Sequence, residues 1–88
     1  MKLKYTFETV ELGEEVIAVP VGQGASKIKG VLKLNREAKE IFEHLKSDTN
    51  EEQIVDALVL KYENSRDVLL KYVQNMIETL RTHGLIEE

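Results

Sequence analysis

The chain has 88 residues, a formal net charge of −4 at pH 7 and no cysteine. This length predicts a single domain over residues 1–88, and the missing cysteine excludes disulfides, thiolate zinc sites and cysteine nucleophiles. An acidic balance argues against tight, nonspecific nucleic-acid binding, and no stretch approaches the roughly 18 apolar residues of a membrane span. Because the first residues also lack the apolar region of a signal peptide, we expect a cytoplasmic protein that binds neither nucleic acid nor membranes.

The first part of the sequence predicts three strands joined by short turns: Leu3–Leu12, Val16–Val21 and Ile28–Leu34. In the first strand the apolar positions change parity at Val10, which predicts a bulge or a twist near Thr9. Pro20 lacks a backbone N–H and is therefore expected near the end of the second strand. A turn with two glycines over residues 22–27 leads to the third strand. Such short connections favour an antiparallel meander.

Three helices are predicted after these strands, over residues 36–46, from about residue 50, and over residues 65–83. Asn35 is a good N-cap for the first helix, because its side-chain oxygen can accept a hydrogen bond from the first turn. Thr49 and Glu52 fit a capping box for the second helix, and Asn64 or Ser65 fits the cap of the third. The elements together predict an α+β fold, winged helix-turn-helix-like, with a three-stranded antiparallel β-meander followed by three α-helices.

The third helix has more apolar surface than one interface requires. Its central stripe is widened by Val68 and Tyr72 on one side and by Leu70 on the other; the stripe itself consists of Leu69, Val73, Met76, Ile77 and Leu80. The apolar arc approaches roughly 200°, whereas about 100° is typical of a surface helix. Two interpretations remain open and are compatible: the helix is wedged between the sheet and the other helices, or Val68, Tyr72 and Met76 line a groove for a partner.

No residue pattern in the sequence predicts catalysis. His44 and His83 lie near predicted helix ends, and neither has a second His at the spacing of a helical metal site. The serines stand in turns or caps, without a G-x-S-x-G motif. Gly22 and Gly24, followed by Lys27, lack the G-K-[ST] ending of a phosphate-binding loop. We therefore expect no enzyme activity, no metal and no cofactor.

A set of short motifs spans most of the chain in a fixed order. The set comprises Val19-Pro20-Val21, Gly30-Val31-Leu32-Lys33-Leu34-Asn35, Ala38, Ile41, Ile54, Leu58, Leu80 and Gly84-Leu85-Ile86. In this order the motifs resemble the PqqD-like family, named for the pyrroloquinoline quinone biosynthesis protein D. Two positions differ from the family pattern: Ser47-Asp48 stands where relatives often have Asp-Gly, and Tyr72 stands where they often have Asp.

The resemblance implies a binding module without catalysis. Members of this family are recognition elements in the biosynthesis of ribosomally synthesised and post-translationally modified peptides (RiPPs). Each acts as a peptide chaperone, holding the leader segment of a precursor peptide and presenting it to a modifying enzyme, often a radical S-adenosylmethionine enzyme. The leader lies as an added strand against the third strand, beside the third helix. By this resemblance we expect a precursor leader and a modifying enzyme as partners, and a monomer or weak homodimer.

The resemblance also places the peptide-binding residues on two elements. They are Lys29, Gly30, Val31, Leu32, Lys33 and Leu34 around the third strand, and Val68, Tyr72 and Met76 on the third helix. Val31 and Lys33 would flank the strand edge while Leu32 and Leu34 face the core. An exposed edge suits this role, since it offers backbone N–H and C=O groups to an extended peptide. The lysines at 27, 29 and 33 would attract an acidic leader.

Two other functions fit the same elements. A winged-helix DNA-binding protein also combines three helices with a small sheet, and the last helix carries Arg66, Lys71, Gln74, Asn75 and Arg81. The same helix carries Asp67 and Glu78 in an acidic domain, which disfavours recognition of base edges. A structural or oligomerisation domain would instead bury the apolar face of the third helix against a second copy, or fill the strand edge by swapping.

Overall fold

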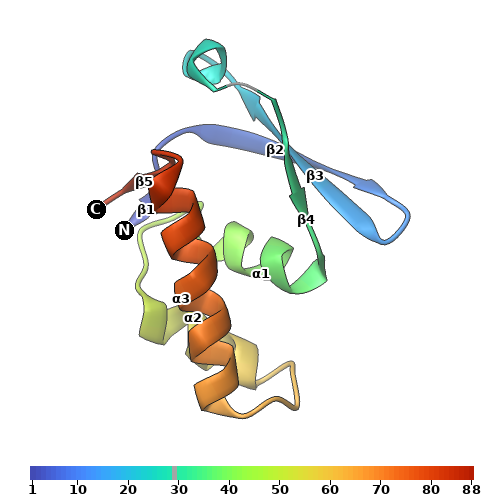
Figure 1. The fold of residues 1–88 in the computed structure, drawn as a ribbon, viewed down its shortest axis with the longest axis vertical. Coiled ribbons are helices and arrows are strands. Elements are labelled where there is room, and N and C mark those ends of the chain that lie inside the picture. The colour runs from blue at the N-terminus through green and yellow to red at the C-terminus, as the bar shows by residue number, and fades with distance from the viewer. Residues whose placement is uncertain (29) are drawn as a thin grey trace.

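The computed structural model describes residues 1–28 and 30–88 and has an α+β architecture (Figure 1). Its strands are β1 (Lys2–Leu3), β2 (Thr6–Leu12), β3 (Glu15–Val21), β4 (Leu32–Leu34) and β5 (Ile86–Glu87). Its helices are a 3₁₀ turn, η1 (Ala25–Lys27), followed by α1 (Arg36–His44), α2 (Glu51–Val59) and α3 (Arg66–Thr82). The predicted order of three strands followed by three α-helices is confirmed.

The main sheet is an antiparallel meander in the order β2-β3-β4, as the sequence predicted. The β2–β3 hairpin turns at Gly13, which has a φ of 68°, and its register runs without interruption from Thr6↔Val21 to Leu12↔Glu15. The bulge predicted near Thr9 is therefore wrong, and the twist predicted as its alternative stays a prediction. The change of apolar parity has a simpler cause: Val10 and Leu12 lie on the exposed side of the hairpin, with 47% and 62% of their surface accessible.

The other two predicted strands differ from the structure in length. Lys4 and Tyr5 form a bend that divides the first strand into β1 and β2. The third strand is three residues long instead of seven, and among the described residues only Leu32–Leu34 pairs with β3. Gly30 has a φ of 83°, in the left-handed region, so the chain cannot run extended through it. Lys29, part of the predicted strand, lies outside the described residues.

Each α-helix begins with a side-chain cap. The oxygen of Asn35 accepts a hydrogen bond from the Ala38 N–H at 2.8 Å, as predicted, and Ser65 caps α3 through the N–H of Val68. For α2, however, the capping box was wrong: the helix begins one residue later, so Asn50 is the cap and accepts from the N–H of Gln53 at 2.9 Å. The Thr49 hydroxyl instead donates to the side-chain oxygen of Gln53.

Helix α3 ends in a Schellman motif. The N–H of Gly84 donates to the Arg81 carbonyl and that of Leu85 donates to the Leu80 carbonyl, both at 2.9 Å, while Gly84 has a φ of 72°. The chain then forms β5, which pairs antiparallel with β1 and brings the two ends of the chain side by side (Figure 1). Among the described residues, no helix has both the length and the apolar character of a membrane span.

A single apolar core joins the sheet to all three helices. Phe7 of β2 and Phe42 of α1 meet edge to face at its centre, with ring centroids 5.1 Å apart. Around this pair lie buried residues from every layer: Leu3, Val16, Ala18, Leu34, Ile41, Leu45, Ile54, Val55, Leu58, Leu69, Val73, Ile77, Leu80 and Leu85. Burial of these apolar side chains supplies the main driving force for folding. It also fixes β4 and α3 relative to each other.

Candidate functional site

A groove of about 330 Å³ lies between β4 and α3, at the seam where the sheet meets the helices. Its lining consists of Leu32, Lys33 and Leu34 from β4, Ala38 from α1, and Tyr72, Asn75, Met76, Thr79 and Leu80 from α3. We call this the β4–α3 groove. Most of its lining side chains are apolar, and Lys33 is the one charged residue among the lining residues that the structure describes. Such a surface suits an apolar or amphipathic ligand.

The floor of the groove is continuous with the core. Leu34 and Leu80 are buried, with 8% and 3% of their surface exposed, while Leu32, Ala38 and Met76 are partly buried and pack against the core cluster. Because the floor is held by core packing, its shape does not depend on a mobile loop.

The strand side of the groove is a sheet edge. Strand β4 pairs with β3 through Ala18↔Leu32, Ile17↔Lys33 and Val16↔Leu34. Within the described part of the chain, no strand pairs with its other side. An edge strand presents backbone N–H and C=O groups that a further strand can use. The groove therefore combines a hydrogen-bonding edge with an apolar floor.

The helix side of the groove carries polar groups along one face of α3. Tyr72, Asn75 and Thr79 follow one another at i, i+3 and i+7, so they share that face. The Thr79 hydroxyl donates to the backbone carbonyl of Asn75 at 3.0 Å. Below these residues, Met76 and Leu80 reach the floor.

The two walls meet at a hydrogen bond between residues 37 positions apart in sequence. The Tyr72 hydroxyl donates to Asn35 Oδ1 at 2.9 Å, and the same oxygen accepts the Ala38 N–H that caps α1. Asn35 directly follows β4, so this bond joins α3 to the corner between β4 and α1. We call it the Asn35–Tyr72 bridge. The sequence identified Asn35 as a cap but gave no sign of this second partner.

The structure brings together five of the nine residues that the sequence assigned to peptide binding. Leu32, Lys33, Leu34, Tyr72 and Met76 line the groove. As expected, Leu34 is buried towards the core and Leu32 partly so, whereas Lys33 is exposed.

The other four assigned residues lie elsewhere. Gly30 and Val31 precede β4 and do not line the groove, although Val31 is 52% exposed. Val68 is 53% exposed and lies one helical turn before Tyr72, beyond the Asn35–Tyr72 bridge. Lys29 lies outside the described residues. The assignment of these four to a binding site stays a prediction.

Four lining residues were missed: Ala38, Asn75, Thr79 and Leu80. Helical spacing could have found those on α3, since Asn75, Thr79 and Leu80 share a face with Tyr72 and Met76. No local signal marks Ala38. Its place in the groove depends on how α1 packs beneath β4.

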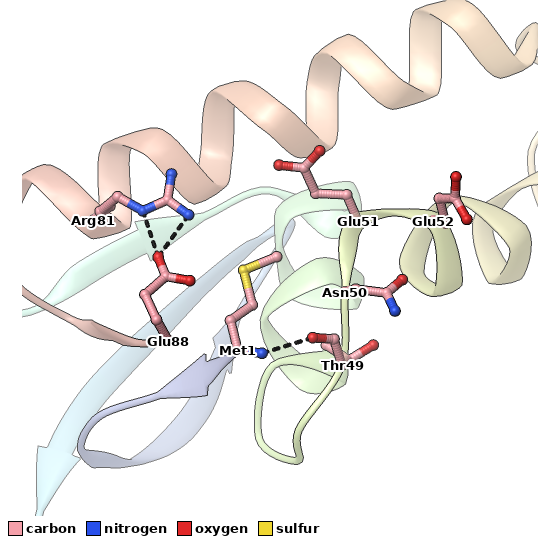
Figure 2. Close-up of a pocket in the computed structure, with 7 residues that line it drawn as sticks. All are labelled: Met1, Thr49, Asn50, Glu51, Glu52, Arg81 and Glu88. Atoms are coloured by element: carbon pink, nitrogen blue, oxygen red, sulfur yellow. Dashed lines mark hydrogen bonds and ion pairs between the residues drawn. The ribbon is translucent and has the colours of Figure 1, made fainter.

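A second hollow, of about 420 Å³, lies where the chain ends meet α2 and α3 (Figure 2). Its lining is mostly polar or charged: Met1, Thr49, Asn50, Glu51, Glu52, Arg81 and Glu88. The Met1 amine donates to the Thr49 carbonyl at 2.8 Å and to Asp48, which is why the pKa of Asp48 lies below its usual value.

Ion pairs at this hollow hold parts of the fold together. Arg81 pairs with Glu78 and Glu88, and hydrogen bonds to these carboxylates raise its pKa. The Arg81–Glu88 pair ties the C-terminal residue to α3, and the Met1 amine ties the other chain end to the segment before α2, so we interpret the hollow as a structural seam. Across residues 1–28 and 30–88, His, Asp and Glu side chains form no group of three suited to a metal ion.

Comparison with solved structures identifies one with the same fold, described as "TbiB1 in Complex with the TbiA(beta) Leader Peptide". It has a TM-score of 0.74 and 21% sequence identity, and the match covers 99% of this chain and 95% of that chain. Among curated proteins, none matches significantly.

A family model provides the assignment. The model for coenzyme PQQ synthesis protein D (PqqD) matches residues 12–86. This range contains β4, the three α-helices and the whole β4–α3 groove. The match confirms the resemblance drawn from the motifs. The chain therefore belongs to the PqqD family.

Proposed function

We propose that this protein is a non-catalytic module that captures the leader segment of a ribosomally made precursor peptide and presents it to a modifying enzyme. The observation that carries the proposal is the β4–α3 groove, an apolar floor beside a strand edge with which no strand of residues 1–28 or 30–88 pairs. Membership of the PqqD family supports it, as does the shared fold of a protein described in complex with a leader peptide.

The groove offers a physical mechanism for capture. An extended leader adds to the free edge of β4, where its backbone continues the sheet ladder. Since successive side chains of a strand point to opposite sides, every second leader residue faces the apolar floor formed by Leu34, Met76 and Leu80. The backbone bonds provide sequence-independent affinity, and the floor selects apolar side chains.

The chemistry of the groove favours binding over catalysis. Its hydroxyl groups belong to Tyr72 and Thr79, and both already donate, to Asn35 and to the Asn75 carbonyl. Within the described lining there is no carboxylate or imidazole to act as a general base. We therefore assign the chemical step to a partner enzyme, which by the resemblance is often a radical S-adenosylmethionine enzyme. Both proteins would act in the cytoplasm.

Charge gives a further preference. Lys33 is exposed at the groove, on the strand that the leader would join. A leader with an acidic residue opposite Lys33 would gain a modest, salt-dependent contribution to affinity.

An amide NMR titration tests the proposal directly. The ¹⁵N-labelled protein is titrated with synthetic leader peptides from precursor genes that neighbour its own. We expect shifts at Leu32–Leu34 and along residues 72–80 of α3, saturating at one peptide per protein.

Two results would contradict the proposal. One is the absence of shifts with every candidate leader. The other is a set of shifts on the exposed side of the β2–β3 hairpin instead of at the groove. Broad changes on adding duplex DNA would point to the winged-helix alternative.

A further inference from the structure

The Asn35–Tyr72 bridge lies at one end of the residues that line the β4–α3 groove, because Tyr72 is the first of the α3 residues among them. The bond spans 2.9 Å between the Tyr72 hydroxyl and Asn35 Oδ1, and it connects the helix wall to the residue that directly follows β4. A chain lying along β4 towards Asn35 would meet this bond.

The bridge is anchored in secondary structure on both sides. Asn35 Oδ1 also accepts the Ala38 N–H at 2.8 Å, so its two lone pairs are both used. Tyr72 lies within the 17-residue helix α3, between the buried residues Leu69 and Val73. Neither Asn35 nor Tyr72 belongs to a long loop. If the bridge opened, Asn35 Oδ1 would keep the hydrogen bond from Ala38 and lose the one from Tyr72.

An unused apolar surface lies beyond the bridge. Val68 precedes Tyr72 by four residues, so it lies on nearly the same face of α3, one turn further from the groove. It is apolar and 53% exposed, yet it is not part of the groove lining. The groove thus stops at Tyr72, although the apolar helix face continues.

We infer that the Asn35–Tyr72 bridge is a stop that sets the length and register of the bound leader, which makes Asn35 and Tyr72 specificity-determining residues. This inference rests on the proposed function. A leader fills the groove up to the bridge, and its next residue turns out into solvent. When the bridge is removed, the groove extends to Val68 and accommodates one or two more residues.

Peptide-extension measurements test the stop. The probe is the fluorescein-labelled synthetic leader of the neighbouring precursor gene, trimmed to the shortest segment that keeps full affinity. Two leucines are then added at either end, and Kd is measured by fluorescence polarisation.

The wild-type protein and the Tyr72→Ala variant should respond differently to the added leucines. With wild type, we expect the extension to change Kd by less than about twofold at both ends, because the added residues stay in water. With Tyr72→Ala, extension at one end should tighten binding about fivefold through contact with Val68. Adding Val68→Ser to Tyr72→Ala should abolish that gain.

A second variant separates the bridge from the loss of the aromatic ring. Asn35→Ser keeps a capping oxygen for α1 but is too short to reach the Tyr72 hydroxyl. It should show the same extension gain as Tyr72→Ala. Far-UV circular dichroism verifies that each variant is folded.

The outcomes distinguish the stop from the proposed function. If extension helps wild type and both variants equally, or if the gain survives Val68→Ser, the stop is wrong while leader binding stands. If wild type binds no leader at all, the proposed function fails and the stop fails with it.

Discussion

Side chains in the β4–α3 groove differ in how much the fold depends on them. Leu34 and Leu80 are almost fully buried and belong to the core, so their substitution would disturb folding and binding together. Met76 packs against the core but is only partly buried, and it reaches the groove from the middle of α3. Met76 therefore offers the cleanest separation of ligand binding from stability.

Met76→Glu should weaken leader binding at least about tenfold, because a carboxylate would replace an apolar contact at the groove floor. The melting temperature should fall by only a few degrees, since the new side chain can reach solvent. Isothermal titration calorimetry and thermal unfolding measure the two effects.

Leu60→Glu is the matched control for this substitution. Leu60 is 87% exposed and lies at the end of α2, away from the groove. The Leu60→Glu variant gains the same negative charge as Met76→Glu, but outside the groove. Its Kd for the leader should therefore stay within about twofold of wild type. Equal losses in both variants would mean that added negative charge, and not the groove, governs binding.

The helices show what a cap contributes beyond periodicity. The spacing of apolar residues located all three helices. The start of α2 was ambiguous because Thr49 and Asn50 are adjacent and both residue types can cap a helix. Asn50 is the cap, whereas the Thr49 hydroxyl bonds to the side chain of Gln53 and not to a backbone N–H of α2.

Replacing each of these two residues by alanine compares their contributions. Asn50→Ala should reduce the free energy of unfolding by about 1 kcal/mol, because an N–H in the first turn loses its acceptor. Thr49→Ala should cost less than about 0.5 kcal/mol, since an exposed bond between side chains contributes little. Urea denaturation gives both values, and a larger loss for Thr49→Ala would restore the predicted capping box.

The β2–β3 hairpin is tied to α1 by an exposed ion pair. Glu11 and Lys39 lie 2.7 Å apart, and the hydrogen bond and charge of Lys39 lower the pKa of Glu11 below its usual 4.5. A carboxyl whose pKa is lowered on folding stabilises the fold above its unfolded pKa. That contribution is lost as the pH falls through the folded pKa.

Comparing wild type with Glu11→Gln tests this dependence. The wild type should melt slightly higher at pH 7, and the difference should shrink as the pH falls below 4.5 and vanish below the lowered pKa of Glu11. The effect is small because the pair is exposed and screened by salt. Thermal melts from pH 7 to pH 3 provide the measurement. A difference that persists at the lowest pH would show that the hydrogen bond matters without the charge.

Local patterns in the sequence account for the main elements and for half of the site. Alternation and helical spacing give the meander, the three helices, and Tyr72 and Met76 among the five α3 residues that line the groove. These patterns fail where the structure depends on the backbone conformation of one residue or on a contact with a residue far away in sequence. The left-handed conformation of Gly30 shortens β4, and the β1–β5 pair joins two-residue strands too short to carry a pattern. The Asn35–Tyr72 bridge depends on the packing of α3 against β4, which no local spacing encodes.

The molecule as a whole depends on one core that also forms the groove floor. Phe42 is fully buried in α1 and contacts Phe7 of the sheet, so it links the two layers. An 88-residue domain has little stability to spare, of order 5–15 kcal/mol.

Phe42→Ala should cost about 3–5 kcal/mol, through lost apolar burial and the cavity that remains. This loss corresponds to a fall in melting temperature of at least about 12 °C. Val10→Ala, on the exposed side of the hairpin, is the control and should melt close to wild type. Differential scanning calorimetry compares them. A small effect at Phe42 would show that the core can collapse around the missing ring.

The short length of β4 has a consequence for kinetics. Under the proposed strand addition, three residues would give a leader only a few backbone hydrogen bonds, each contributing about 1 kcal/mol net. The sequence-independent part of the binding would therefore be weak, and side-chain contacts in the groove would set most of the affinity. A leader held in this way would dissociate quickly. Rapid release suits a carrier that must hand its cargo to an enzyme and then take up the next one.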